Sequence, residues 1–466
     1  MTVRTFLKKS IPYIIAIVLL LVGYYIKLAL PIISGYGAKN LCSCVYVGGR
    51  TPQSVIDNEL SGFPISMAKF RVDNSDSSAH GSVFGLSPRK AIYRKGLGCT
   101  LISQIDEAEL RSQVTSQKIK LATKPEINQD TIAWPMGNKL NDSISFGIDR
   151  NALNTVINKA FEEPSGKPKR RTRAIVVVYD GQIIGEKYGD EFDMNSPQMG
   201  WSMTKSLTNA MFGHLELEGK LKRQNNAAIW EWRQDERKNI TMDDLLHMSS
   251  GLGWNENYSG PSSATNMLFK SRFMGMYAAD NKLKYKPGEV FYYSSGTTNI
   301  ISRLIRQVYN DDKYYRFAYE ELFYKIGMLT LVMEPDAGGT FVGSSYSYAT
   351  ARDWARFGLL YLNKGVWNGE RLLTEQWVTY STTPTIGAKR GEYGAHFWLN
   401  AGEAGNRANR IYPDVPTDLY WADGFEGQNV FILPSKKLVV VKLSQTTGDA
   451  LDDNQFLKDI IALLPQ

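Results

Sequence analysis

The stretch "GWSMTKSLTNAMFGHLELEGKL" (residues 200–221) places a serine three residues before a lysine, at the start of an amphipathic helix pattern. Residues three apart share one face of a helix, so the Lys205 amine can reach the Ser202 hydroxyl. A partly desolvated lysine can act as a base for a serine, and the helix N-terminus favours developing negative charge. Serine is also an ordinary helix cap. This motif alone therefore leaves both a nucleophile and a cap open.

Two later stretches favour the nucleophile. "KPGEVFYYSSGTTNIISRLI" (286–305) places Tyr293 and Ser295 after a Pro-Gly turn and before a helix, in a loop that can aim both hydroxyls into a cleft. "DGFEGQNVFILP" (423–434) is a glycine-flanked turn directly before a strand, where backbone N–H groups can face an oxyanion.

The order and kind of these three motifs resemble the serine β-lactamase and penicillin-recognising family. The match is best in the class C β-lactamase-like branch, near the 6-aminohexanoate-oligomer hydrolases and carboxylesterases. The resemblance covers about residues 146–466. It implies an α+β fold, in which N- and C-terminal helices flank an antiparallel sheet and a mainly helical subdomain is inserted.

The resemblance also implies roles for single residues. Ser202 would be the acylated nucleophile, Lys205 its partner, and Tyr293 the acid/base that protonates the leaving group. The backbone N–H groups of Ser202 and Gln428 would form the oxyanion hole. Further substrate contacts are expected from Trp201, Ser295, Phe425, Glu426, Gly427 and His396. For Trp201, packing in the core is an equally good interpretation.

One departure from the family pattern bears on the substrate. Where penicillin-binding relatives carry K-T-G or H-x-G, this chain has Phe425-Glu426-Gly427. No basic side chain is then ready to hold the carboxylate of a β-lactam or peptide. We therefore expect a hydrolase for a neutral or amine-bearing ester or amide, with Glu426 as a candidate for recognising a cation, rather than an efficient β-lactamase.

The N-terminus carries a long apolar run. Residues 10–26 are uncharged and follow Arg4, Lys8 and Lys9, while Lys27 can snorkel and "LALPII" (28–33) extends the run. We predict an uncleaved membrane helix, because no cleavage signal follows closely. The basic flank favours a cytoplasmic N-terminus, which would place the catalytic domain on the periplasmic or extracellular side of a bacterial inner membrane.

Three parts are therefore expected. Residues 1–39 form a cytoplasmic N-terminal end and a membrane anchor, residues 40–145 form an extension of unknown role, and residues 146–466 form the hydrolase domain. Short strands are predicted up to residue 103, followed by a polar connector. Cys42, Cys44 and Cys99 allow one disulfide to Cys99 and leave one thiol over. A metal site is the less favoured alternative, because no histidine cluster lies near them.

Within the third part, helical spacing is predicted near residues 149–161 and an apolar closing helix at 453–464. Asp180-Gly181 marks a hairpin turn, and a second pair of strands (429–444) turns at Pro434 to Lys437. Strands near both ends of this part, with helices between them, imply one sheet closed by distant segments.

Other chemistries lack their motifs. The sequence has no H-E-x-x-H, no paired C-x-x-C and no phosphate-binding glycine loop, so neither a metal nor a nucleotide cofactor is predicted. His214 and His247 are expected to be polar packing residues in helices. The net charge of +7 is spread thinly, and its densest run, "KPKRRTR" (167–173), is interpreted as a solvated loop rather than a nucleic-acid site.

Two other functions remain open at this point. The chain could be a binding protein that keeps the fold without turnover and engages cell-envelope peptides or a protein partner. Alternatively, residues 40–145 could carry the function and the hydrolase domain could support them. The intact set of Ser202, Lys205 and Tyr293 favours an enzyme whose partners are an ester or amide substrate and the membrane.

Overall fold

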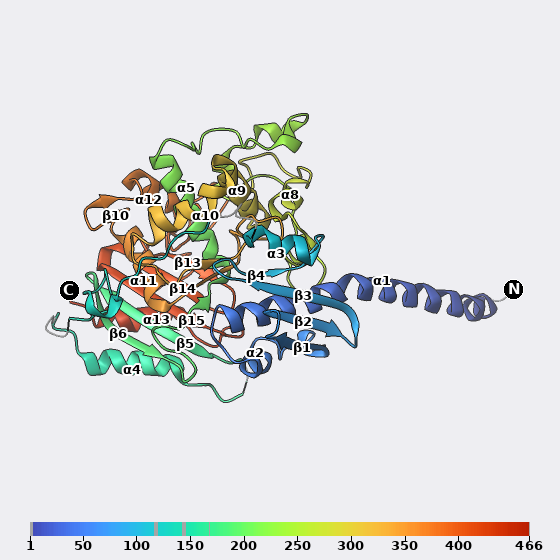
Figure 1. Cartoon of the computed structure of the whole chain (residues 1–466), viewed down its shortest axis with the longest axis horizontal. Helices are drawn as coiled ribbons and strands as arrows, with labels where there is room; N and C mark the ends of the chain where they lie inside the picture. Colours follow the sequence, from blue (N-terminus) through green and yellow to red (C-terminus); the bar gives the residue numbers. More distant parts are fainter. Residues whose placement is uncertain (1–2, 116–119, 142–145, 167, 466) are drawn as a thin grey trace.

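A six-stranded antiparallel sheet lies at the centre of the protein (Figure 1). The computed structural model describes residues 3–115, 120–141, 146–166 and 168–465, so the predicted boundary at 145/146 and Lys167 lie outside the described residues. The strand order is β12-β13-β14-β15-β5-β6. The strands are β5 (Thr172–Tyr179), β6 (Gln182–Tyr188), β12 (Trp398–Leu399), β13 (Tyr420–Gly424), β14 (Gln428–Leu433) and β15 (Leu438–Ser444).

The sheet is closed by segments far apart in the chain, because β15 pairs with β5. The hairpin between β5 and β6 turns at Asp180 and Gly181, both with the positive φ that such a turn requires (45° and 78°). The second hairpin turns through a 3₁₀ segment at Pro434–Lys436, followed by Lys437 in the left-handed region. Both predicted hairpins are confirmed.

Helices cover both faces of the sheet. On one face, α4 (Arg150–Phe161) and α13 (Asp453–Ala462) pack against alternate strand residues such as Ile175 and Val177. On the other face, α11 (Ala351–Leu362) packs against β14, β15 and β5. This arrangement confirms the predicted α+β class, with the N- and C-terminal helices of the domain flanking the sheet.

The segment between β6 and β12 is mainly helical, as expected. Besides α11, its α-helices are α5 (Thr204–Leu217), α6 (Met242–Leu246), α7 (Ser263–Lys270), α8 (Met274–Ala279), α9 (Ser295–Val308), α10 (Asp311–Phe317) and α12 (Glu375–Ser381), with a π-helical turn at Ala318–Phe323. Its short strands are β7 (Gln198–Met199), β8 (Val332–Met333), β9 (Ser347–Ala349), β10 (Val366–Trp367) and β11 (Glu370–Arg371). Thr241 and Asp244 form a capping box that begins α6.

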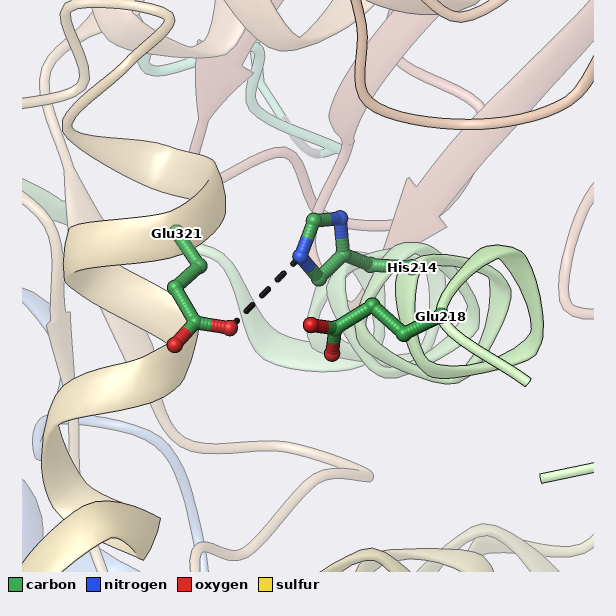
Figure 2. Close-up of side chains that lie close together, drawn as sticks. All are labelled: His214, Glu218 and Glu321. Carbon is green, nitrogen blue, oxygen red and sulfur yellow. Dashed lines mark ion pairs between the residues drawn. The ribbon is translucent and has the colours of Figure 1, made fainter. Parts of the chain in front are cut away.

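The far end of α5 carries a polar cluster of His214, Glu218 and Glu321 (Figure 2). Each carboxylate already has a cationic partner, Lys220 for Glu218 at 2.8 Å and Lys313 for Glu321 at 2.8 Å. One ring nitrogen of His214 bonds a backbone carbonyl at 3.0 Å. We interpret the cluster as a charge-paired junction between helices, which agrees with the packing role expected for His214.

The N-terminal part is built on one long helix, α1 (Val3–Tyr46), packed across a four-stranded antiparallel sheet. The sheet consists of β1 (Ala68–Asp73), β2 (Ser78–Val83), β3 (Leu86–Arg94) and β4 (Gly98–Leu101), and the short helices are α2 (Pro52–Asn58) and α3 (Glu107–Thr115). Helix α1 continues through residue 39, where a domain boundary was expected. Protein also covers residues 28–33 in part, so the freely exposed apolar run ends before "LALPII".

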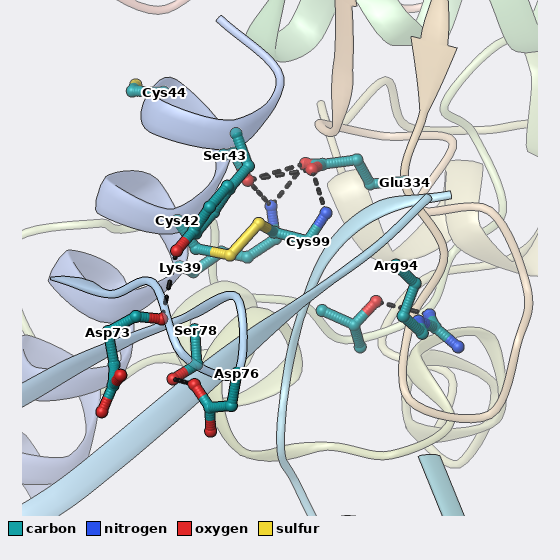
Figure 3. Close-up of a disulfide and its surroundings, with 12 residues drawn as sticks. Lys39, Cys42, Ser43, Cys44, Asp73, Asp76, Ser78, Arg94, Cys99 and Glu334 are labelled. Carbon is teal, nitrogen blue, oxygen red and sulfur yellow. Dashed lines mark hydrogen bonds and ion pairs between the residues drawn. A yellow bond between two sulfur atoms is a disulfide. The ribbon is translucent and has the colours of Figure 1, made fainter. Parts of the chain in front are cut away.

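The disulfide Cys42–Cys99 ties α1 to β4, and Cys44 is the remaining, buried thiol (Figure 3). Beside it, the Lys39 ammonium of α1 donates to the Glu334 carboxylate at 2.5 Å, and both side chains are almost fully buried. Glu334 belongs to the hydrolase domain and also accepts from the Cys99 backbone N–H at 2.6 Å. The extension and the domain thus share one buried polar centre.

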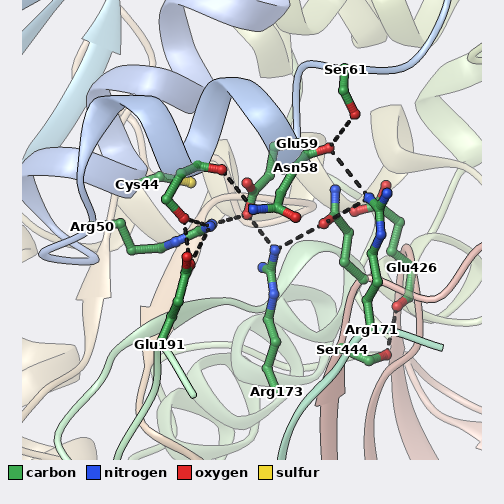
Figure 4. A network of polar contacts seen from close by, with 12 residues as sticks. Cys44, Arg50, Asn58, Glu59, Ser61, Arg171, Arg173, Glu191, Glu426 and Ser444 are labelled. Atoms are coloured by element: carbon green, nitrogen blue, oxygen red, sulfur yellow. Dashed lines mark hydrogen bonds and ion pairs between the residues drawn. The ribbon is translucent and has the colours of Figure 1, made fainter. Parts of the chain in front are cut away.

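A second set of ion pairs joins the two parts at the end of α2 (Figure 4). The Glu59 carboxylate pairs with Arg50 of the extension and with Arg173 of β5, the latter at 2.6 Å. Arg50 also reaches Glu191 at 3.3 Å. In the loop before β5, Arg170 donates to the carbonyls of nearby residues, so this part of the basic run is used for structural contacts.

Candidate active site

Ser202 lies in a tight 3₁₀ turn (Trp201–Met203) that leads directly into α5. Trp201 has a φ of +46°, a strained conformation for a bulky residue. The turn is also tightly confined: a Cβ on Gly200 would come within 2.6 Å of the Trp354 ring, and one on Gly424 would collide with the Gly200 carbonyl. Helix α11 and the end of β13 therefore hold the serine in place.

The Lys205 ammonium lies one helical turn from Ser202 and is fully partnered. Nζ donates to Ser202 Oγ at 3.0 Å, to Ser295 Oγ at 3.0 Å and to the Ser344 carbonyl at 2.9 Å. These three acceptors match the three N–H donors of an ammonium. The amine is therefore aimed at the serine and bridges α5 to the start of α9.

Burial changes the acidity of this lysine. Desolvation lowers the pKa of Lys205 to about 8, while the negative charges of Glu256 and Asp423 oppose the shift. A lysine with such a pKa is about one tenth neutral at pH 7, whereas an ordinary lysine is less than about one thousandth neutral. It can therefore take a proton from a serine, which an ordinary exposed lysine does poorly.

Tyr293 covers the same amine, with its ring centre 4.8 Å from Lys205 Nζ. Burial raises the pKa of Tyr293 well above its usual value, although a hydrogen bond with Ser202 opposes the rise. The ring packs against Tyr393 at 5.8 Å and Trp398 at 5.6 Å between centroids. The phenol is thus held rigidly in its protonated form beside the serine.

Ser295 connects the lysine to two residues that the sequence did not single out. Its hydroxyl donates to Glu256 Oε1 at 2.6 Å and lies 3.1 Å from the Tyr258 hydroxyl. The Glu256 carboxylate also accepts from the Ser295 backbone N–H at 3.0 Å. Glu256 and Tyr258 lie in an irregular loop without a motif or periodicity, so only the fold reveals that they border the lysine.

Replacing Glu256 by Gln is expected to shift the pH dependence of the reaction. Removing this negative charge lowers the pKa of Lys205 further, so the amine becomes neutral at lower pH. In a plot of the fluorophosphonate labelling rate against pH, the midpoint of the acidic limb should move to a lower pH by roughly one unit. Labelling reactions that are quenched at fixed times between pH 5 and pH 9 give this rate profile. Glu256→Asp is the matched control, and an unshifted limb in Glu256→Gln would contradict this electrostatic coupling.

The turn between β13 and β14 borders the nucleophile on the other side. Phe425 is 56% exposed, and its ring meets Trp201 edge-on at 5.8 Å. Trp201 is half-buried and stacks on Tyr36 of α1 at 6.3 Å. Gln428 is buried, and its side-chain amide donates to the carbonyls of Phe425 and Ser444, which fastens the turn to β15.

Two of the expected substrate contacts lie elsewhere. His396 is only 2% exposed, so the expectation that it lines an open cleft is wrong. Its ring bonds Thr298 at 3.2 Å, and burial lowers the pKa of His396 to about 3, so it is a neutral packing residue. Glu426 lies near Arg173 and Glu59 in the ion-pair network (Figure 4), where burial raises the pKa of Glu426 to about 7. A cationic substrate would have to compete with those arginines.

The sequence profile of the Beta-lactamase family matches residues 157–462, about two thirds of the chain. The protein belongs to the beta-lactamase family. The family resemblance drawn from the three motifs is thereby confirmed.

Individual relatives agree with this placement. The chain is 23% identical over 309 residues to 6-aminohexanoate-dimer hydrolase from Paenarthrobacter ureafaciens, covering 59% of this chain and 72% of that protein. Among solved structures, a putative 6-aminohexanoate-dimer hydrolase from Bacillus anthracis superposes with a TM-score of 0.56 at 21% identity, over 78% of this chain and 96% of that one. A family VIII carboxylesterase gives a TM-score of 0.51 at 15% identity, over 72% and 99%. This beta-lactamase-family chain is a serine hydrolase.

Proposed function

We propose that the protein is a membrane-anchored hydrolase that cleaves an ester or amide through an acyl-enzyme on Ser202. The observation that carries this proposal is the buried Lys205 amine, which is hydrogen-bonded to Ser202 Oγ and has a lowered pKa. A serine that served only as a helix cap would not need such a partner. The 6-aminohexanoate-dimer hydrolase relative, whose name describes hydrolysis of a dimer, supports this reaction class.

The proposed reaction has two halves. Neutral Lys205 takes the proton from Ser202 Oγ as the oxygen attacks the carbonyl carbon, and a tetrahedral oxyanion forms. Tyr293, protonated because of its raised pKa, gives a proton to the leaving alcohol or amine, and the Ser202 ester remains. Lys205 then passes the proton that it took to the Tyr293 phenolate, which restores both groups. Water gives a proton to neutral Lys205 as it attacks the ester, and Lys205 returns that proton to Ser202 Oγ as the acid product leaves.

Backbone N–H groups are proposed to hold the oxyanion. Ser202 supplies one from the 3₁₀ turn before α5, and the β13–β14 turn supplies the other, from Gln428 by the family resemblance. Two features support a rigid hole: the close approach of Gly424 to Gly200, and the Gln428 side chain that fastens the turn. Preformed donors of this kind stabilise developing charge without reorganising.

The exposed Phe425 is proposed to line the substrate cleft, with Trp201 as its wall. Ser295, expected to contact substrate, is fully buried, and its hydroxyl bonds Lys205 and Glu256 instead. Gly427 has a φ of +81° and lies close to Ser444, so this glycine shapes the turn rather than binding substrate through a side chain. The absence of a basic residue in Phe425-Glu426-Gly427 favours an uncharged acyl group over a β-lactam or peptide carboxylate.

Helix α1 is proposed to anchor the enzyme. It is long and apolar enough to cross a membrane, and the side chains of residues 13–27 are exposed in the structure. The basic residues before the run favour a cytoplasmic N-terminus, so the hydrolase domain would face the periplasm or the exterior of a bacterial inner membrane.

Replacing Tyr293 by Phe is expected to slow turnover of an activated ester by about 10²-fold, because the leaving group loses its positioned acid. The fluorophosphonate should still reach Ser202, since fluoride leaves without a proton. Intact mass and initial rates, measured on the same preparation, separate the two effects. Tyr393→Phe, which alters the packing neighbour, is the control. Unchanged ester turnover in Tyr293→Phe would exclude the proposed acid role.

A further inference from the structure

A group of exposed apolar side chains lies at one end of the small N-terminal sheet. Phe84 and Leu86 form the tip of the β2–β3 hairpin and are 73% and 58% exposed. Phe63 and Met67, at 84% and 37% exposed, lie in the segment that leads into β1. We call these four residues the sheet tip. Single exposed apolar residues are common, but four large ones from neighbouring segments suggest a contact surface.

The strand register places Met67, Phe84 and Leu86 at the same end of the sheet. Phe63 stays close to Met67, because the Ser66 N–H bonds the Gly62 carbonyl at 3.0 Å and the Met67 N–H bonds the Pro64 carbonyl at 3.2 Å. Ala68, directly after Met67, pairs with Val83, directly before Phe84. The opposite end of β1 and β2 is the turn after Asp73, where Tyr46 at the end of α1 donates to the Asp73 carbonyl at 3.2 Å. The C-terminal end of α1 and the sheet tip thus lie at opposite ends of the strands.

Helix α1 runs from that far end towards the sheet tip. Its Ser34 carbonyl and Gly37 lie against Gly81 and Phe70, at the middle of the strands. From Gly81 to Phe84 is about 10 Å along the strand, and from Ser34 back to Lys27 is about 10 Å along the helix. Phe84 and Lys27 are therefore about equally far from the contact between Ser34 and Gly81. Phe84 lies beside the part of α1 that becomes fully exposed. Figure 1 shows α1 leaving the body beside the ends of β2 and β3.

We propose that the sheet tip is a second membrane contact, which inserts into the surface of the same bilayer that α1 crosses. The continuity with the exposed apolar run of α1 indicates lipid as the occupant. Lys27 and Lys69 are exposed beside this end, where cations favour anionic lipid headgroups. The inference rests on the proposed anchoring by α1 and does not depend on the hydrolase chemistry.

Two-point attachment has a consequence for the enzyme. A single helix lets a domain tilt freely, whereas a second contact beside it limits the tilt. Tyr36, which stacks on Trp201 next to the nucleophile, is ten residues past Ile26, or about 15 Å along α1. The active-site turn is therefore held close to the membrane surface, where amphiphilic esters and amides concentrate.

Spin labels on the full chain in nanodiscs of phosphatidylcholine and phosphatidylglycerol test the proposal, at one copy per disc. The native cysteines are a disulfide and a buried thiol, so a nitroxide attaches to an introduced cysteine. Phe84→Cys and Phe63→Cys report on the sheet tip, and Leu20→Cys reports on α1. Ser75→Cys, in the exposed β1–β2 turn at the other end of the same strands, is the matched control.

We expect the labels at positions 20, 63 and 84 to be accessible to oxygen and shielded from a water-soluble nickel chelate, with the opposite pattern at 75. In a Phe84→Glu and Leu86→Glu background, the label at 63 should return to water while the label at 20 stays in lipid. Labels at 63 and 84 as water-accessible as the one at 75, beside a lipid-embedded position 20, would overturn the docking but leave the anchoring. Position 20 in water would overturn both. Shielding that needs two copies per disc would overturn the proposal in favour of a contact between copies.

Discussion

Ser202→Ala is expected to abolish covalent labelling and to reduce turnover by at least about 10³-fold, because the substitution removes the proposed nucleophile. Intact mass after exposure to a fluorophosphonate measures the first effect, and initial rates on a panel of esters and amides measure the second. Lys205 remains in place in this variant, so the loss reports on the nucleophile itself.

Ser206→Ala is the matched control for Ser202→Ala. Ser206 is a buried serine on the same helix, and its hydroxyl bonds the His396 carbonyl at 2.7 Å rather than Lys205. The Ser206→Ala variant should react with the fluorophosphonate at close to the wild-type rate. Full activity of Ser202→Ala on every substrate that the wild type cleaves would refute the proposed mechanism, and a folded wild type that never labels would favour the binding-protein hypothesis.

Glu334→Ala is expected to destabilise the protein by about 3–5 kcal/mol, the largest stability effect that we predict. The substitution leaves the Lys39 ammonium buried without its counter-ion and removes the acceptor of the Cys99 N–H. Because Lys39 lies in α1 and Glu334 in the hydrolase domain, the junction between the two parts should loosen. Thermal unfolding of the full chain in one fixed detergent measures the loss.

The double variant Lys39→Met, Glu334→Gln separates charge burial from packing. It removes both charges and keeps most of the volume, so it should be more stable than Glu334→Ala. A surface pair, Lys364 with Glu375, is the comparison, since Glu375→Ala should cost below about 1 kcal/mol. If Glu334→Ala unfolds at the wild-type temperature, the buried pair is not a structural centre.

Local sequence rules account for much of the fold. The Asp180-Gly181 turn, the capping box of Thr241 and the amphipathic helix near 149–161 all depend on contacts within a few residues, and the structure contains each of them. The motif around Ser202 likewise placed Lys205 correctly, because one helical turn separates the two side chains. Strands near both ends of the hydrolase part predicted a sheet closed by distant segments, and the pairing of β15 with β5 confirms this closure.

The site is only partly local. Ser295 and Tyr293 were expected near Ser202, but Glu256 was not, because its loop carries no pattern and meets Ser295 only after α9 and the loop have packed. His396 was expected at the cleft and is instead buried, since a sequence does not show which side of a loop faces the core. Glu426 was assigned to the substrate, but in the structure it faces arginines of the N-terminal junction.

The sequence by itself determined the fold class, the apolar helix and the serine–lysine pair, because each follows from short-range periodicity, turn chemistry or spacing on one helix. Only the tertiary structure decided that α1 continues from its apolar run into the body, stacks Tyr36 on Trp201 and pairs Lys39 with Glu334. Those contacts join residues that are far apart in the chain. Their partners are selected by the burial of apolar surface and by the need to pair each buried charge, and both are properties of the whole folded chain rather than of any one segment.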